Sequence, residues 1–321
     1  MKYLITLKPL EPFLFGGENT FGVLGNKEQG TYLVKSRLFP QQSALLGMLK
    51  KEIMTQSGVL TRKIRGEWVD KTAKQKAVDL VGSEKFDILQ TQVQNFGVIK
   101  NLGAVFLMQQ NDAYIKKVAS DDFSYEDGIL KGYNPKEDIY DNFVSIKNDK
   151  KLKTDAIFQE VEQTGNKKNG GDNSLFKKTA YLLKDNFVFA FDLDVDFELQ
   201  SGIVTLGADR SKFLMQVQES ESSLQYEDKN THLTLLSDAY ITVENIAQHC
   251  DFAITSEISF QTLQNKKHAT QQNKFQKSKK VNLYEKGSVF MNPSEELLQN
   301  LNNANCQKIG LNIYTYNQGE K

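Results

Sequence analysis

The sequence predicts an α+β protein with mostly antiparallel sheets, divided into two domains at residues 1–180 and 181–321. A length of 321 residues corresponds to two domains of ordinary size. Candidate strands and helices interleave without the regular strand–helix repeat of a doubly wound fold. Hydrophobic residues make up 39% of the chain and charged residues 25%, which is typical of a globular protein and argues against wholesale disorder.

The chain opens with a predicted strand at residues 3–10. Tyr3, Ile5 and Leu7 recur there with the two-residue period of a half-buried strand. A glycine-rich loop follows at residues 15–22.

A helix is predicted next, at residues 42–55. Pro40 lies just before its first turn, where a missing N–H group costs nothing. The apolar face of this helix consists of Leu45, Leu46, Leu49 and Ile53.

Residues 58–180 are polar and less periodic, and we interpret them as long insertions in the first domain. The clearest strand, at residues 187–199, has an apolar face and an acidic face. The apolar face holds Phe187, Phe189, Phe191, Leu193, Val195, Phe197 and Leu199, and the acidic face holds Asp192, Asp194, Asp196 and Glu198. The remaining predictions are strands at 203–206 and 213–217 joined by a turn at 207–211, a strand at 233–243, a helix at 293–302 and a final strand at 309–314.

Charge is balanced over the whole chain but segregated along it. Lys+Arg and Asp+Glu both number 40, which excludes a globally basic nucleic-acid coat protein. Basic residues dominate at 50–76 and 266–286, and acidic residues dominate at 121–141. Each run is compatible with a solvated surface, but two basic runs favour a localised anion-binding surface such as one for an RNA backbone.

Several classes of protein are disfavoured by missing motifs. No P-loop, dinucleotide fingerprint, CxxC pair or nucleophile elbow occurs, and two cysteines are too few for a disulfide framework. No stretch of 18 apolar residues and no signal-peptide core is present, so we expect a cytoplasmic protein without a membrane partner. Three histidines argue against a His-rich metal site, and the acidic strand face is better explained by solvation, so no metal or cofactor is expected.

Glycines at predicted strand ends and turns are more informative. Each is compatible with ordinary turn chemistry, or with close approach of the backbone to a phosphate. The glycines are Gly16, Gly17, Gly207, Gly287 and Gly310, with Arg37, Arg210 and Lys286 nearby to neutralise phosphate.

Four segments in a fixed order resemble a known family. Residues 10–15 and Phe21 are similar to its opening strand and loop, and residues 36–49 to its Phe-Pro segment and helix. Residues 204–210 resemble its Leu-Gly-Gly-Glu-Arg turn, and 286–290 with 309–312 resemble its Gly-Ser-Val strand and closing glycine loop. The family is the RAMP superfamily of RNA-binding proteins, and within it the handle-binding subunit, subunit three, of the type III-B CRISPR effector called the Cmr complex.

The resemblance implies two ferredoxin-like (RRM-type) domains with glycine-rich loops. It also implies a non-catalytic scaffold for antiviral defence that binds the 5′ handle of crRNA. Such a subunit bridges the large polymerase-like subunit and the backbone subunit, and meets target RNA through the complex. This chain departs from the family pattern, because Gly16 and Asn19 occupy usually basic positions, Ala208 replaces glycine, and Ser211 replaces a second arginine.

The candidate RNA-binding residues come from these segments. They are Gly16, Gly17, Asn19, Phe21, Ser36, Arg37, Phe39, Gln42, Ser43, Lys50, Lys51, Gly207, Ala208, Asp209, Arg210, Lys286, Gly287, Ser288, Gly310 and Asn312.

Three alternatives remain open. A crRNA-processing endoribonuclease of the same superfamily often has a general-base histidine in its N-terminal half, whereas the first histidine here is His232, so Tyr or Lys would have to substitute. The chain could also be the equivalent subunit of another type III complex, although the Phe39-Pro40 pair favours the Cmr type. A protein-only adaptor with solvated basic runs is the third.

Overall fold

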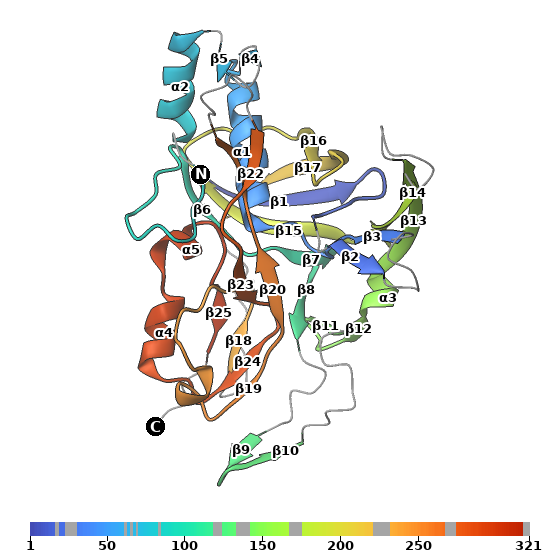
Figure 1. Cartoon of the computed structure of the whole chain (residues 1–321), viewed down its shortest axis with the longest axis vertical. Coiled ribbons are helices and arrows are strands. Elements are labelled where there is room, and N and C mark those ends of the chain that lie inside the picture. Colours follow the sequence, from blue (N-terminus) through green and yellow to red (C-terminus); the bar gives the residue numbers. More distant parts are fainter. Residues whose placement is uncertain are drawn as a thin grey trace.

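The computed structural model describes residues 1–16, 19–22, 31–60, 63–64, 67–68, 70–82, 85–117, 124–132, 142–166, 175–220, 232–266 and 274–316. Within these ranges the chain forms one large sheet, two four-stranded sheets and four two-stranded pairs, with few helices (Figure 1). The predicted α+β class with mostly antiparallel sheets is confirmed, since β14 with β3 is the one parallel pair among the described strands. The division into two ferredoxin-like domains stays a prediction.

The large sheet is organised around the first strand. β1 (Lys2–Pro9) pairs antiparallel with β15 (Val188–Val195) on one side and with β17 (Ser211–Glu219) on the other. The order across the nine-stranded sheet is β12 (Lys151–Lys153), β11 (Asn142–Ser145), β8 (Asp112–Lys117), β7 (Phe106–Gln109), β15, β1, β17 and β16 (Gly202–Leu206), and β6 (Ile99–Leu102) also pairs with β15. The sheet therefore extends across residue 180, where the sequence predicted a domain boundary.

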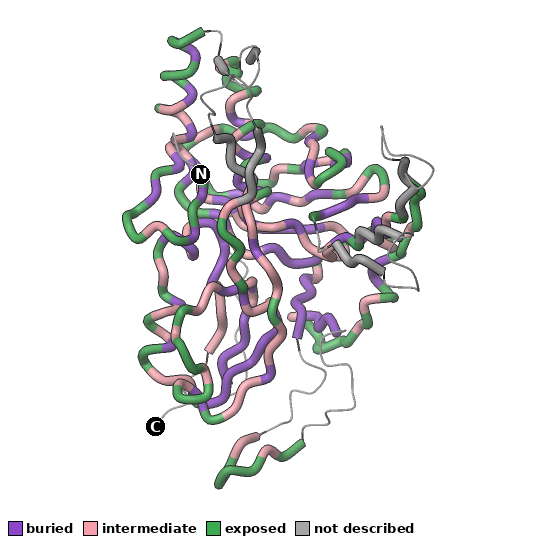
Figure 2. The backbone as a smooth tube through the Cα atoms, viewed as in Figure 1, coloured by how far each residue is buried: buried purple, intermediate pink, exposed green. Residues whose placement is uncertain are grey.

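The main core lies on one face of this sheet. Ile5 and Leu7 of β1 are fully buried beside their partners Phe191 and Phe189 of β15, as the two-residue period predicted. Helix α1 (Gln42–Gln56) covers this face and contributes its own buried apolar residues, which confirms the predicted helix. In Figure 2 the buried parts of β1 and β15 run together through the middle of the molecule.

A four-stranded sheet lies beside the main core. Its order is β13 (Phe158–Asn166), β14 (Leu175–Leu183), β3 (Thr31–Lys35) and β2 (Asn19–Gly22). Phe13, just after β1, forms a bridge with Tyr181 of β14, and both side chains are buried. The opening loop is thereby fixed between the two sheets.

The second four-stranded sheet belongs to the C-terminal part of the chain. Its order is β19 (Phe252–Ile254), β24 (Val289–Met291), β18 (Leu233–Leu235) and β25 (Tyr314–Thr315). Helix α4 (Glu295–Leu301) packs Leu297 and Leu301 against this sheet. The side chain of Ser294 caps α4 by accepting from the backbone N–H of Leu297.

The remaining elements are short. They are β4 (Lys63–Ile64), β5 (Glu67–Trp68), α2 (Lys71–Val81), β9 (Ser124–Glu126), β10 (Ile129–Lys131), α3 (Thr154–Ile157), η1 (Ile246–Gln248), β20 (Glu257–Phe260), β21 (Leu263–Lys266), β22 (Lys274–Lys277), β23 (Val281–Tyr284) and α5 (Ala304–Lys308). No helix among the described residues is long and apolar enough to cross a membrane.

Three predictions about elements need correction. Residues 58–180 are more than insertions, because β6, β7, β8, β11 and β12 complete the large sheet. The strand expected at 233–243 ends at Leu235, because the following residues turn back to pair Ala239 with Tyr284. The strand expected at 309–314 begins only at Tyr314, in β25, because Gly310 and Asn312 turn the chain with φ angles of +80° and +57°.

Gly310 lies at a close approach between segments that are far apart in the sequence. A Cβ atom there would lie 2.3 Å from the carbonyl oxygen of Gly103. Gln42, the first residue of α1, donates from Nε2 to the carbonyl oxygens of Gly103 (3.1 Å) and Gly310 (3.0 Å). These contacts join α1, the turn between β6 and β7, and the C-terminal glycine turn.

We expect Gly310→Ala to lower the free energy of unfolding by about 2–3 kcal/mol, because it adds both a clash and a strained backbone. Gly202→Ala is the matched control, since a Cβ atom at Gly202 meets nothing within 4 Å. The control should change stability by about 0.5 kcal/mol or less. Urea unfolding of both variants measures the difference, and equal stabilities would contradict the proposed crowding at Gly310.

Candidate RNA interface

Three neighbouring cavities begin at Gln41, just before α1, and continue along one side of this helix. We call them together the α1 groove. The first cavity has a volume of about 630 Å³, the second about 370 Å³ and the third about 390 Å³. Arg37 and Gln41 line both the first and the second cavity. Gln41, Ala44, Gln261 and Thr262 line both the second and the third. The shared residues show that the three cavities are neighbours.

The second cavity brings together three of the four segments that carry the family resemblance. Phe15 and Gly16 come from the opening loop, Arg37 from the segment before α1, and Gly207 and Ala208 from the turn before β17. The register of β1 on β17 explains this meeting. Because Pro9 at the end of β1 pairs with Phe213 near the start of β17, the loop after β1 and the turn before β17 lie at the same sheet edge.

Gly207 allows the turn to pack directly on the opening loop. Its φ is +90°, and a Cβ atom there would lie 2.6 Å from the carbonyl oxygen of Leu14. That oxygen accepts a 2.9 Å hydrogen bond from the N–H of Ala208. The sequence predicted a close backbone approach at Gly207, and in the structure the backbone that approaches is that of Leu14.

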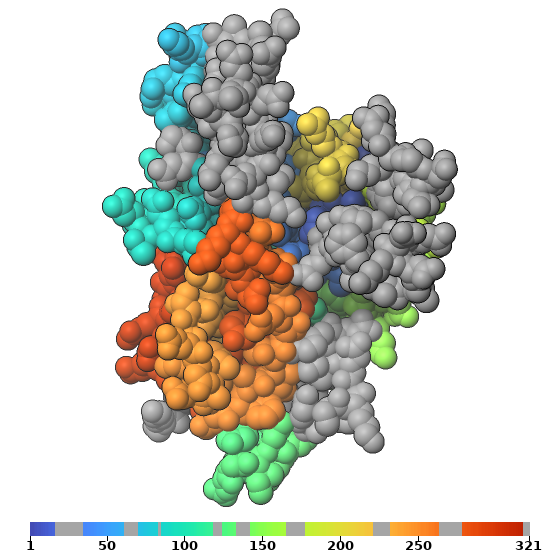
Figure 3. Space-filling model, in the orientation of Figure 1, coloured from blue at the N-terminus to red at the C-terminus, as the bar shows by residue number. Residues whose placement is uncertain are grey.

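Arg37 connects the opening loop with the C-terminal part of the chain. Its backbone N–H donates to the carbonyl oxygen of Phe15 at 3.2 Å, and its guanidinium donates to the carbonyl oxygen of Ser259 in β20. Ser36 supports the same loop, because its hydroxyl accepts from the N–H of Phe15 at 2.8 Å. Figure 1 shows the β20–β23 ribbon rising from the C-terminal sheet toward α1, and in Figure 3 the orange residues of this part form a continuous surface.

The second and third cavities are cationic. Their described lining residues include Arg37, Lys50 and Lys85 and no aspartate or glutamate. The first turn of α1 contains no acidic residue and no side-chain cap, and Ser43 and Ala44 of that turn line the third cavity. The positive end of the helix dipole therefore adds to the potential of the lysines.

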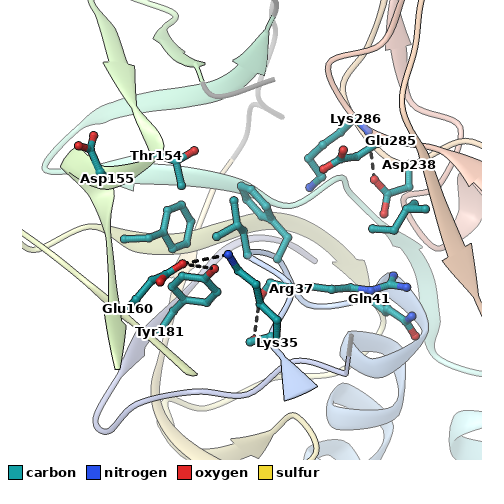
Figure 4. Close-up of a pocket in the computed structure, with 15 residues that line it drawn as sticks. Lys35, Arg37, Gln41, Thr154, Asp155, Glu160, Tyr181, Asp238, Glu285 and Lys286 are labelled. Atoms are coloured by element: carbon teal, nitrogen blue, oxygen red, sulfur yellow. Dashed lines mark hydrogen bonds and ion pairs between the residues drawn. The ribbon is translucent and has the colours of Figure 1, made fainter. Parts of the chain in front are cut away.

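The first cavity has a mixed charge. On one wall Glu160 accepts from Lys35 at 3.0 Å and from the hydroxyl of Tyr181 at 3.1 Å (Figure 4). The hydrogen bond with Lys35 lowers the pKa of Glu160 and raises the pKa of Lys35, while burial raises the pKa of Tyr181. The Lys35–Glu160 pair is half exposed, so it adds little to stability.

The opposite wall holds Asp238, Glu285 and a buried lysine, Lys286 (Figure 4). The Lys286 ammonium donates to the carbonyl oxygen of Val105 at 3.0 Å and lies 3.8 Å from the centroid of the Phe39 ring. Burial lowers the pKa of Lys286 to about 8, against the opposing influence of the Asp238 carboxylate.

Several predicted site residues are engaged in the fold rather than in the groove. Asn312 is fully buried, and its amide accepts from the N–H and donates to the carbonyl oxygen of Tyr240. Ser288 is fully buried and donates to the carbonyl oxygen of Glu285. Gly287 lies against the backbone of Lys116. Gln42 and Gly310 meet at the turn described above.

The other predicted residues lie around the groove or outside the described side chains. Lys51 donates to the hydroxyl of Thr205 at 3.2 Å, and Asp209 pairs with Lys178 at 2.8 Å. Arg210 is exposed at the end of the Gly207 turn. Gly17 lies outside the described residues, and of Asn19 and Phe21 only the backbone in β2 is described. RNA contact by each candidate residue stays a prediction.

Sequence reasoning missed part of the groove. Lys85, Glu160, Tyr181, Gln261 and Thr262 lie far from the segments that carry the resemblance, and only long-range pairing brings them there. Local signals for them are absent from the sequence. Among the described residues, no group of three or more His, Cys, Asp or Glu side chains is placed to hold a metal ion.

The structure is thus an α+β fold with a groove beside α1, and the second and third cavities of this groove are cationic. No family model matches the sequence, and no curated protein matches it. Among solved structures, a chain of the type III-B Cmr-beta bound to cognate target RNA is 13% identical, with 98% of this chain and 96% of that chain covered and a TM-score of 0.56. A chain of the same particle bound to cognate target RNA and AMPPnP, state 1, is also 13% identical over the same coverage, with a TM-score of 0.51. The chain therefore shares a fold with a chain of the type III-B Cmr-beta over nearly its whole length.

Burial of Lys286 should make stability depend on pH. Between about pH 8 and 10.5 the unfolded lysine keeps its proton while the folded one loses it, so the free energy of unfolding rises with pH by about 3 kcal/mol. Lys286→Met should lack this rise. Urea unfolding from pH 7 to 10 compares the variant with wild type, and Lys74→Met in α2 controls for loss of one exposed positive charge. Parallel profiles for wild type and Lys286→Met would contradict the prediction.

Proposed function

We propose that this chain is a non-catalytic RNA-binding subunit of a type III-B CRISPR effector complex, acting in antiviral defence. It corresponds to subunit three, binds the 5′ handle of crRNA, and bridges the large polymerase-like subunit to the backbone. The observation that carries the proposal is the second cavity, where the opening loop, the segment before α1 and the Gly207 turn meet. The shared fold with a Cmr-beta chain supports it.

The groove has the physical properties that a single RNA strand requires. Phosphates are attracted by Arg37, Lys50 and Lys85, and the described walls of the second and third cavities contain no carboxylate to oppose them. Gly16 and Gly207 line the second cavity and place no side chain in it. A neutral chain can therefore bind RNA at one local surface.

The endoribonuclease alternative finds less support in this site. His232 is buried, and His249 lies beside Ser294, with 3.3 Å between Nδ1 and Oγ. Neither residue lines a described cavity of the groove. Lys286 has a pKa near the working range of a general base, but its ammonium is held against Val105 and Phe39.

The test is binding of the full chain to crRNA with its native 5′ handle and to the same RNA with a scrambled handle. Fluorescence anisotropy at two salt concentrations gives affinities, and a denaturing gel shows whether RNA is cut. Handle-selective binding of intact RNA supports the proposal. Equal affinity for both RNAs contradicts handle recognition by this chain, and cleaved RNA contradicts the non-catalytic assignment.

We expect Lys50→Ala/Lys85→Ala to weaken binding of handle RNA. Loss of two phosphate contacts should reduce the slope of log affinity against log salt by about 1.4. Lys74→Ala/Lys76→Ala is the matched control, because it removes the same charge from exposed positions of α2 outside the groove. Equal losses in both double variants would show that general charge, rather than the groove, attracts RNA.

A further inference from the structure

The first cavity differs in chemistry from the rest of the α1 groove. Its walls contain four carboxylates and three cationic side chains. In the described walls of the second and third cavities, all the charged side chains are cationic. All three cations already have partners within the protein, since Lys35 pairs with Glu160, Lys286 donates to Val105 and Arg37 donates to Ser259. A phosphate in this cavity would face the carboxylates, so the cavity selects a neutral group.

The apolar part of the first cavity suits a flat ring. Phe39, Phe158 and Tyr181 line it together with Leu38 and Ile258. The three rings pack edge to face, with centroids 6.2 Å apart for Phe39 and Phe158 and 6.0 Å apart for Phe158 and Tyr181. Contact of a nucleobase with aromatic side chains is favourable for every base, and a volume of about 630 Å³ is that of a small-ligand site.

The polar part of the cavity suits a base that carries an amino group. Asp155, Glu160, Asp238 and Glu285 line this part, and a carboxylate has about four acceptor positions. Glu160 already accepts from Lys35 and Tyr181, Asp238 from the N–H of Lys286, and Glu285 from Lys116, which leaves positions for a further donor. Adenine, cytosine and guanine each carry an exocyclic amino group that donates, whereas uracil carries carbonyl oxygens in its place. Carboxylates would repel the O4 atom of uracil and bind the N4 amino group of cytosine.

Arg37 is labelled among the residues that line the first cavity (Figure 4), and it also lines the second, so it lies where the two kinds of cavity meet. We propose that the first cavity receives one unpaired, amino-bearing base of the bound RNA, while the phosphate of the same nucleotide lies at Arg37 in the second cavity. This inference rests on the proposed function and adds a base-specific site to it. The remaining nucleotides follow the cationic part of the groove.

The test begins with a scan of the handle RNA in which one base at a time is replaced by an abasic site. The full chain should show one position where loss of the base lowers affinity about tenfold while the phosphate is kept. At that position cytosine should bind about tenfold more tightly than uracil. These two bases share the same ring and differ at two neighbouring positions: cytosine has an amino donor at C4 and an acceptor at N3, whereas uracil has an acceptor at C4 and an N–H donor at N3. A preference for cytosine therefore reports a carboxylate placed at the C4 position.

Two variants in β13 then connect the sensitive base to the cavity. Glu160→Ala removes a carboxylate from the wall, and Glu162→Ala removes one from the same strand outside it. Each glutamate pairs with an exposed lysine, Lys35 or Lys177, so both variants release one positive charge. The cytosine preference should fall toward one in Glu160→Ala and persist in Glu162→Ala.

The outcomes separate the two proposals. Handle-selective binding with a flat abasic scan, or uracil binding as tightly as cytosine, overturns the base site and leaves the proposed function intact. Loss of the preference in Glu162→Ala to the same extent as in Glu160→Ala also overturns the base site. Equal affinity for native and scrambled handles overturns the proposed function, and the base site with it.

Discussion

The antiparallel pairing of β1 with both β15 and β17 is the constraint on which the rest of the structure depends. It joins the first residues of the chain to residues near 190 and 215, and it builds the main core on one face of the sheet. The same register places the loop after Pro9 beside the turn before Phe213. The groove therefore results from the pairing of strands that are far apart in the sequence, since its walls come from several segments.

Contacts of the C-terminal part then complete the groove from the other side. Gln42 bonds to Gly103 and Gly310, and Arg37 bonds to Ser259, so the beginning of α1 is joined to two C-terminal segments. A buried amide that satisfies two carbonyl groups is costly to displace. These contacts set the distance between α1 and the Gln261–Thr262 wall, and hence the width available to a ligand.

Elements with strong local periodicity could be predicted from the sequence, and elements set by long-range contacts could not. The alternation of apolar residues predicted β1 and β15, and the apolar face predicted α1. All three predictions are correct because each element buries one face. Residues 309–312 have the composition of a strand, yet Gly310 and Asn312 adopt positive φ to fit against Gly103 and Tyr240. Nothing local signals such partners, which lie 72 or more residues away.

Motifs that look alike in the sequence also divide into two physical roles. The Gly207 turn and the segment at Ser36 and Arg37 line the groove, whereas Ser288 and Asn312 are fully buried and hydrogen bonded within the C-terminal part. A glycine or a small polar residue is required wherever backbones approach closely, whether the partner is RNA or another strand. Position relative to a cavity separates these cases. By that criterion, the proposed binding chemistry belongs to the cationic second and third cavities beside α1 and to the mixed walls of the first cavity, whereas Gly310 packs against Gly103 and Gln42 within the fold.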